Sequence, residues 1–362
     1  MTDAERRTRN MTANRSFRMS ATLGIGAAGA LLAKLAGMPL PFLLGPLILS
    51  AAAGLAGLPL QVVPFGREAA QVVIGLSIGL RFLPEVAIAT GALLPLMVAA
   101  TFLTISATML AAFLLARIGG IDRRTAFFAT SAAGLAEMAV VAHRKRADAD
   151  IVSVVHLIRV TSIVMIAPLL AAYAGTEGHV PDVRSALGDH LLVVLLLLLA
   201  AGLAAWLLRS LRVPNLWLLV PAAVGGLAAG TGLVAERLPG PLLIAAQVVI
   251  GVWIGCRFRR EVMSRMPRVT VSAFATTALL LAFACLVALA LAAVAGLPFN
   301  TALLAVAPAG VTEMSLTAAA LHLDAATVTA FQMMRIATVM IMLPLTYRLF
   351  EWCSDRLDAK DT

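Results

Sequence analysis

Four charged residues stand inside apolar stretches of the chain, where an unpaired charge is costly. Glu137 and Glu313 are the acidic residues in such stretches, and Arg159 and Arg335 are the basic ones. The spacing from each glutamate to the arginine that follows it is the same in both cases. Inserting one charge near the centre of a bilayer costs roughly 2.5 to 3.5 kcal/mol, so four uncompensated charges would cost on the order of 10 kcal/mol. The four side chains are therefore expected to be paired, hydrated or used in function.

Two interpretations fit this pattern. In the first, Glu137 pairs with Arg159 and Glu313 pairs with Arg335, and each pair only ties two helices together. In the second, the four residues lie around a central cavity and bind a solute and a coupling ion. A buried arginine can hold a carboxylate through two hydrogen bonds, and a desolvated glutamate can take up and release a proton near neutral pH. The two interpretations are compatible.

Three further polar residues are candidates for the same site. His156 precedes Arg159 by three residues and so shares its helix face. It is either a hydrogen-bonded core histidine or a pH-responsive, solute-contacting group. Gln71 and Gln247 open two matching segments, and each could form hydrogen bonds in a cavity or between helices.

The composition shows what must position these residues. Of the 362 residues, 61% are hydrophobic and 13% are charged, and the mean hydropathy is +0.95. This is more apolar surface than a soluble fold buries, and the apolar runs of about 18 to 25 residues can cross a bilayer as helices. The sequence predicts an all-α polytopic membrane protein. Its expected parts are a cytoplasmic basic tail (1–18), a first membrane repeat (19–174), a periplasmic linker (175–189), a second membrane repeat (190–350) and a cytoplasmic tail (351–362).

The duplication is visible in the residues themselves. The segment QVVIGLSIGLRF, which starts at Gln71, matches QVVIGVWIGCRF, which starts at Gln247, at nine of twelve positions. The offset from Gln71 to Gln247 also relates the two glutamates to each other and the two arginines to each other. One register kept over so much of the chain predicts two homologous halves.

The distribution of positive charge predicts that the two halves are inverted. If each half crosses the membrane six times, the 28 Lys and Arg split into 14 inside and 12 outside, with Arg159 and Arg335 in the membrane. If the fifth element of each half, 124–143 and 300–322, is re-entrant or broken, the split becomes 22 inside and 4 outside. Cytoplasmic loops are enriched in Lys and Arg, so we expect two inverted repeats of about five transmembrane helices plus one re-entrant or broken helix each. Both termini are then cytoplasmic.

The two fifth elements carry residues that suit a break. Non-helical backbone at membrane depth is tolerated where it is buried in protein or lines a cavity. Gly134 and Gly310 permit a break in SAAGLAEM and APAGVTEM, and Pro308 removes a backbone donor. The alternative is an ordinary helix whose small residues pack against a neighbour.

Several classes of function lack the residues that they need. His156 is the histidine deep in a span, and neither HxxH nor ExxH occurs, so we expect no metal, no cofactor and no enzymatic activity. Tails of about 18 and 12 residues and a linker of about 15 cannot hold a DNA-reading fold, so we expect no nucleic-acid partner. The chain has no GxxxxGK[ST] motif for ATP-driven transport.

The paired QVVIGxxIGxRF segments, the GxxEM tracts and the arginine helices that follow them resemble the membrane AbrB-duplication family over nearly the whole chain. Its members are bacterial integral membrane proteins that carry the labels regulator, ammonia monooxygenase and transporter, and the family is linked to control of gene expression. The resemblance implies a multi-pass protein of the bacterial inner membrane. The missing metal ligands argue against the monooxygenase label.

We therefore expect a secondary transporter of a small organic solute in the lipid bilayer. The two arginines favour an anionic solute and H⁺ is the first expectation for the coupling ion, whereas the two carboxylates would equally admit Na⁺ coupling or a cationic solute. Any effect on gene expression would be indirect. The alternative is a non-transporting membrane sensor or regulator in which the same charges form a switch. The sequence leaves a homo-oligomer open.

Overall fold

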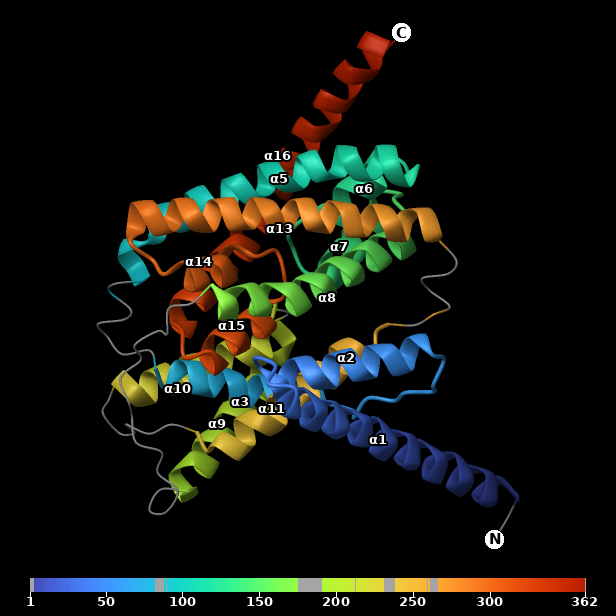
Figure 1. The fold of residues 1–362 in the computed structure, drawn as a ribbon, viewed down its shortest axis with the longest axis vertical. Helices are drawn as coiled ribbons and strands as arrows, with labels where there is room; N and C mark the ends of the chain where they lie inside the picture. The colour runs from blue at the N-terminus through green and yellow to red at the C-terminus, as the bar shows by residue number, and fades with distance from the viewer. Residues whose placement is uncertain are drawn as a thin grey trace. The chain divides into compact units, whose positions relative to one another are not determined.

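The computed structural model is helical, with no strand, over the residues that it describes, which are 3–81, 88, 90–174, 191–211, 213–230, 238–258, 260 and 266–361 (Figure 1). Within these ranges, the side chains of 3–14, 135–137, 191 and 357–361 are not described. Six helices in this part of the chain are long and apolar enough to cross a membrane. The prediction of a polytopic membrane protein is confirmed. The six are α1 (Asp3–Leu35), α5 (Leu94–Gly119), α8 (Ala149–Tyr173), α9 (Leu191–Leu208), α13 (Pro267–Ala295) and α16 (Ala325–Asp361).

Shorter helices fill the space between the long ones, and local residues explain where several helices begin and end. Aspartates begin α6, α8 and α16: Asp122, Asp148 and Asp324 each accept a hydrogen bond from the backbone N–H three residues later, at 3.0 Å. Gly120 and Gly296 end α5 and α13 with φ of 65° and 66°, the left-handed conformation that favours glycine. The shorter helices are α2 (Pro41–Leu55), α3 (Gly66–Gly79), α6 (Arg123–Thr130), α7 (Leu135–Arg144), α10 (Leu216–Gly230), α11 (Gly240–Gly255), α14 (Phe299–Val306) and α15 (Val311–Ala320), with a 3₁₀ turn at Arg209–Leu211.

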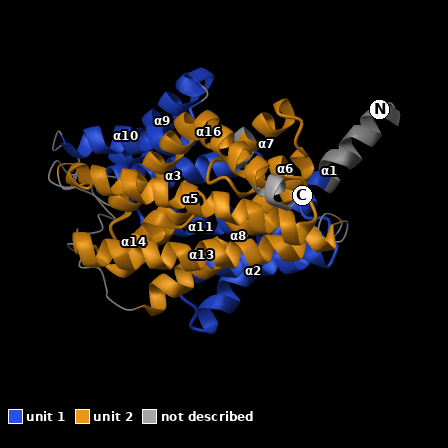
Figure 2. Cartoon of the chain, turned by 90° about the horizontal axis from the view of Figure 1, so that it is seen from above, with its two compact units in different colours: residues 1–83, 181–262 blue, residues 84–180, 263–362 orange. Residues whose placement is uncertain are grey.

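The helices group into two compact units (Figure 2). Unit 1 comprises residues 1–83 and 181–262 and contains α1 to α3 and α9 to α11. Unit 2 comprises residues 84–180 and 263–362 and contains α5 to α8 and α13 to α16. Each unit therefore takes its helices from both halves of the sequence. The two units cut across the two halves of the sequence, because helices of one half pack on helices of the other. The linker 175–189 lies outside the described residues.

Unit 1 depends on close helix crossings at glycines. Helix α3 crosses α10 at Gly75 and Gly79, and α11 crosses α2 at Gly251 and Gly255. A Cβ atom at any of these glycines would overlap or crowd a backbone carbonyl oxygen of the facing helix. The GxxxG spacing lets two helix backbones approach closely, which is a common basis of helix association in membranes. Each half thus makes the same contact with the other half.

Unit 2 contains the two interrupted elements. Helices α5 and α13 lie side by side, α8 packs against α6 and α7, and α16 packs against α14 and α15 (Figure 1). Residues 131–134 separate α6 from α7, and residues 307–310 separate α14 from α15. These interruptions fall within the two elements, 124–143 and 300–322, that the sequence predicts to be re-entrant or broken. The two broken elements correspond at the offset of the duplication, from Arg123 and Phe299 at their starts.

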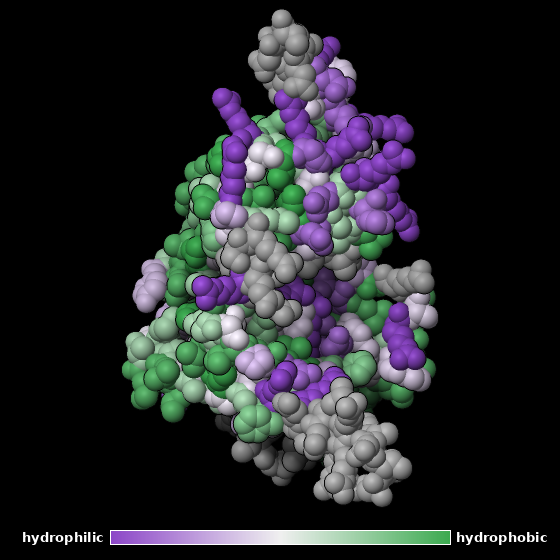
Figure 3. Space-filling view, turned by 90° about the vertical axis from the view of Figure 1, so that its right-hand side faces the viewer, coloured by the Kyte–Doolittle hydropathy of each residue, from purple (hydrophilic) through white to green (hydrophobic). Residues whose placement is uncertain are grey.

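Much of the described surface is apolar. In Figure 3 hydrophobic residues cover large areas of the face drawn, whereas hydrophilic residues gather beside the C-terminal end. Leu192, Leu199 and Leu203 on α9 are among the exposed large side chains. Such helices are suited to contact with lipid.

The glycine crossings give a test of unit 1. We expect Gly75→Ala and Gly251→Ala each to lower the thermal stability of the purified protein in detergent, because a Cβ there meets backbone that cannot move aside, and overpacking costs about 1 to 3 kcal/mol. At Gly202 in α9 an added Cβ meets no atom within 4 Å. Gly202→Ala should be neutral or stabilising, since alanine favours a helix by about 1 kcal/mol over glycine. Equal effects at all three positions would contradict the tight crossings.

Candidate functional site

The predicted site residues fall into both units. Arg159 on α8 and Arg335 on α16 lie in unit 2 and are buried, with 3% and 4% of their surface exposed. Glu313 on α15 and His156 on α8 are buried in the same unit. Glu137 lies on α7, and its side chain is outside the described residues. Gln71 and Gln247 lie in unit 1, buried on α3 and α11, which pack against each other.

The break between α14 and α15 is held by side chains from α16. Arg335 donates from Nη1 to the carbonyl oxygen of Ala307 at 2.7 Å and from Nη2 to that of Ala309 at 2.9 Å. Gln332 donates from Nε2 to the carbonyls of Leu304 and Ala307, at 2.8 and 3.0 Å. Carbonyls at the end of a helix lack helical partners and carry the negative end of its dipole. A cation and an amide therefore replace the hydrogen bonds that the break removes.

Glu313 approaches the other end of the same break. It is the third residue of α15, and its carboxylate fills the space where a Cβ of Gly310 would stand. A carboxylate in the first turn is stabilised by the free N–H groups and by the positive end of the helix dipole. Gly310 and Gly134 have φ of −75° and −68° with ψ of 142° and 145°, an extended conformation open to any residue. The backbone conformation at these two positions therefore does not itself require glycine, whereas Gly310 makes room for the carboxylate.

The break between α6 and α7 is held in a similar way from α8. Arg159 donates from Nη1 to the carbonyl oxygens of Thr130 and Ser131, at 2.5 and 3.0 Å. Its Nη2 lies 2.7 Å from Nε2 of His156, and this ring nitrogen lies 2.9 Å from the carbonyl oxygen of Ala133. His156 takes the place that Gln332 has in the second half. Pro308 has no counterpart here, because Ala132 stands at that position.

Among the described residues, the partners of the two arginines are backbone carbonyls and, for Arg159, His156, with no carboxylate. Glu313 and Arg335, both described, form no ion pair with each other, so the direct pairing of the first interpretation is not seen there. Arg159 and Arg335 are close enough for their charges to act on each other. The Nε atoms of both have no hydrogen-bond partner among the described residues. Each break thus has a buried guanidinium beside it, whose Nε–H has no acceptor among the described residues.

A small cavity adjoins Arg335. Its volume is about 10 Å³, and Thr101 and Thr104 of α5 and Phe331 of α16 line it together with the arginine. This is about the room that one water molecule needs. Sequence reasoning missed the two threonines, because threonine hydroxyls in helices commonly bond to their own helix, as these do.

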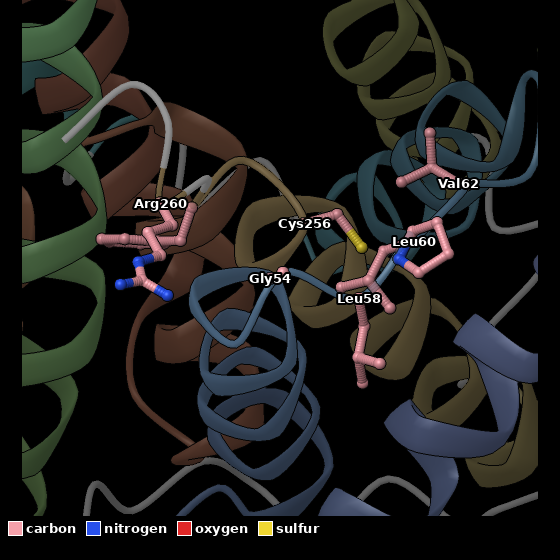
Figure 4. A pocket seen from close by; sticks show the side chains of 9 residues that line it. Gly54, Leu58, Leu60, Val62, Cys256 and Arg260 are labelled. Atoms are coloured by element: carbon pink, nitrogen blue, oxygen red, sulfur yellow. The ribbon is translucent and has the colours of Figure 1, made fainter. Parts of the chain in front are cut away.

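A larger pocket lies in unit 1, away from the predicted residues. Its volume is about 410 Å³, and it is formed by the residues after α2 and after α11 (Figure 4). The sulfur of Cys256 points toward Leu58 and Leu60, whereas the guanidinium of Arg260 lies on the other side of Gly54. None of the predicted site residues lines this pocket, and in the described part of the chain no three His, Cys, Asp or Glu gather as for a metal ion.

The bonding at the second break predicts how its two charged residues respond to substitution. Arg335→Met should lower stability by several kcal/mol, because it removes two hydrogen bonds from a charged group to buried carbonyls, each worth about 1.5 to 3 kcal/mol. Since no ion pair joins them, the effects of Arg335→Met and Glu313→Gln should add within about 0.5 kcal/mol in a double-mutant cycle measured by unfolding in detergent. Arg348→Met, at an exposed position of the same helix, is the matched control. Recovery of stability in the double variant would establish an ion pair instead.

Comparison with known proteins places the chain in a family. The model of the AbrB family, described as "Transition state regulatory protein AbrB", matches residues 2–82 and 51–351. The chain is 28% identical over 359 residues to "Uncharacterized protein YhjN" of Bacillus subtilis (strain 168), covering 90% of this chain and 91% of that protein. It is 27% identical over 336 residues to "Putative regulator AbrB" of Escherichia coli (strain K12), covering 89% and 93%. No solved structure matches. Because the family model spans nearly the whole chain, this membrane protein belongs to the AbrB family.

Proposed function

We propose that the protein is a secondary transporter of the bacterial inner membrane that moves a small organic anion together with a coupling cation. The observation that carries the proposal is the pair of broken helices in unit 2, each with a buried arginine at its break. Secondary transporters build their solute and ion sites from interrupted helices, with half-helix ends and unwound backbone at the site. Arg159 and Arg335 supply guanidinium groups there, which suit a carboxylate or another anion.

The small size of the cavity beside Arg335 bears on the mechanism. About 10 Å³ admits a water molecule and no organic solute. Solute binding in this region therefore requires the helices of unit 2 to rearrange, as a transporter must when it opens its site to one side of the membrane and then to the other.

Contacts at the ends of helices support the inverted topology. Arg268 donates from Nε to the carbonyl oxygen of Ile118 at 2.8 Å, and Nζ of Lys145 lies 5.4 Å from the ring centre of Tyr347. With six full crossings in each half, Arg268 and Ile118 would lie on opposite sides of the membrane. Two inverted repeats put both on the cytoplasmic side, with the C-terminal end of α16. The ion pair of Arg124 with Glu351, at 3.7 Å, fits the same arrangement.

The topology can be tested by thiol labelling. In a chain without Cys256, Cys285 and Cys353, we expect Lys145→Cys and Arg260→Cys to be shielded from a membrane-impermeant maleimide added to intact cells. Ser185→Cys, in the linker that is predicted to be periplasmic, should react and serves as the control. All three should react after the cells are permeabilised. Labelling of Lys145→Cys from outside would contradict the inverted arrangement.

Transport itself can be tested in proteoliposomes with radiolabelled acetate, lactate, malonate and succinate. We expect at least one of these anions to accumulate relative to empty liposomes. Arg159→Lys should reduce the initial rate at least about tenfold, because lysine keeps the charge but cannot present the two-pronged guanidinium. Arg348→Lys, at an exposed site, should keep the full rate. No accumulation of any of the four anions would count against the proposal.

One finding favours a second candidate function. The Escherichia coli relative bears the name "Putative regulator AbrB", which suits a membrane sensor that binds a solute without moving it. In that case purified protein would bind one of the four anions, whereas proteoliposomes would show no flux. The same charges at the breaks would then form a switch between two arrangements of unit 2.

A further inference from the structure

The side chains that bond to the carbonyls of the two breaks differ at one corresponding position. Gln332 holds the second break through an amide, which does not titrate, and its Nε2 donates to two carbonyls. The first half has His156 at the equivalent position of the duplication. Histidine is the side chain that changes charge nearest to physiological pH. One break is therefore fixed by a permanent donor and the other by a titratable one.

The histidine nitrogen at the first break has two partners that compete. Nε2 of His156 lies 2.7 Å from Nη2 of Arg159 and 2.9 Å from the carbonyl oxygen of Ala133. A ring nitrogen either carries a hydrogen and donates or is bare and accepts. Bare Nε2 accepts from Arg159, whereas protonated Nε2 donates to Ala133. The two contacts cannot both be hydrogen bonds at the same time.

Protonation of the imidazole decides which of the two partners Nε2 bonds to. An imidazolium carries hydrogens on both nitrogens, so Nε2 donates to Ala133 and Arg159 loses its acceptor. Arg159 keeps its Nη1 bonds to Thr130 and Ser131, and its Nε already lacks a partner among the described residues. The hydrogen of Nε and one of the two hydrogens of Nη2 lie on one edge of the guanidinium, the fork that binds a carboxylate through two parallel bonds.

We propose that His156 is the site of the coupling proton, and that its protonation releases the Nε and Nη2 edge of Arg159 to bind a carboxylate group of the solute. The proposal rests on the transport function proposed above and names its coupling ion and its solute class. The step is the uptake of one proton from bulk solvent, in which H3O⁺ gives its proton to Nε2 of His156 and becomes water, and no other covalent bond changes. The added positive charge is balanced by the carboxylate.

Electrostatics makes the two binding events cooperative. A protonated His156 beside Arg159, with the charge of Arg335 also acting there, places cations together in a buried region. The carboxylate reduces this repulsion between the cations, so each ligand raises the affinity for the other by the same factor.

Other ionisable residues lie on the helices that pack against α8 and on α16. They include Glu137, His143 and Arg144 (α7), Glu313 (α15), Arg335 (α16), Arg123 and Arg124 (α6), and Arg268 and Cys285 (α13), whereas α14 has none.

The second break cannot serve in the same way. Nη2 of Arg335 is held by the carbonyl oxygen of Ala309, and no titratable side chain among the described residues bonds to it. Its Nε has no partner among the described residues, but the edge is half occupied at every pH. The coupling is therefore confined to the first half.

The test uses two substitutions of His156 with opposite effects on the guanidinium. His156→Gln places the residue of the second half at the first break, where an amide can bond to Ala133 and to Arg159 at every pH. His156→Leu removes both bonds and leaves the edge of Arg159 free at every pH. His143→Gln, which replaces an exposed histidine on α7, is the matched control.

The readout is the affinity for acetate, lactate, malonate and succinate, measured as thermal stabilisation of the purified protein and as uptake driven by an inward proton gradient. For the wild type and His143→Gln we expect the Kd of a bound anion to fall by up to about tenfold per unit of pH decrease. His156→Gln should bind weakly at every pH, and His156→Leu should bind at every pH with no proton-driven uptake. Both should lose the pH dependence, so either variant alone is informative.

The outcomes separate this proposal from the one on which it rests. If the wild type neither binds nor transports any of the four anions, both proposals fall. If the wild type transports but His156→Gln keeps its pH dependence, the transport function stands and the role of His156 is overturned. If Glu137→Gln removes the pH dependence and His156→Gln does not, the proton resides on Glu137, which also overturns the proposal.

Discussion

The constraint on which unit 2 depends is that carbonyl groups released by a broken helix need donors where lipid supplies none. Each break leaves carbonyls without helical partners at membrane depth, where an unsatisfied backbone group costs several kcal/mol. Arg159 and Arg335 meet this need from the helices that follow the breaks. A guanidinium suits the task because its five N–H donors reach several carbonyls and its charge opposes the negative helix end. The positions of Gln332 and His156 follow from the same requirement.

The exchange of helices between the halves accounts for the two units. The crossings at Gly75 and at Gly251 join a helix of one half to a helix of the other, so the first three helices of both halves form one unit. The remaining helices, which carry the breaks, form the second. Two corresponding broken helices, each bonded to side chains of another helix, thus come to lie within a single compact unit. Divergence of one copy, as at His156 and Gln332, then gives the two breaks different properties.

The sequence was sufficient to predict several features. Hydropathy indicated the long helices, small-residue tracts indicated where two of the elements are interrupted, and charges within apolar runs indicated which charged residues are buried. It could not give the partners of the arginines, since every residue has a carbonyl and no side chain marks those of Ala307 or Thr130. The reason for Gly310 was also missed, because glycine provides both backbone freedom and space, and only the position of the Glu313 carboxylate distinguishes them. The GxxxG spacing of Gly75 and Gly79 was present in the segment that revealed the duplication. The helix of the other half that packs against these glycines could not be read from the sequence.

The hydrogen bonds of the two arginines can be compared with the free-energy cost of placing a charge inside the membrane. Hydrogen bonds to a charged group are worth about 1.5 to 3 kcal/mol each, so the two bonds of Arg335 are comparable with the roughly 2.5 to 3.5 kcal/mol that its insertion costs. No titratable side chain among the described residues bonds to that arginine. At the first break, one donor of Arg159 depends on a histidine nitrogen that a carbonyl also contacts. A ligand shifts an equilibrium between two arrangements only by its difference in affinity for them, and a proton on this histidine would favour one of the two contacts over the other. The asymmetry between His156 and Gln332 therefore puts the responsive element of unit 2 at the first break and the fixed one at the second.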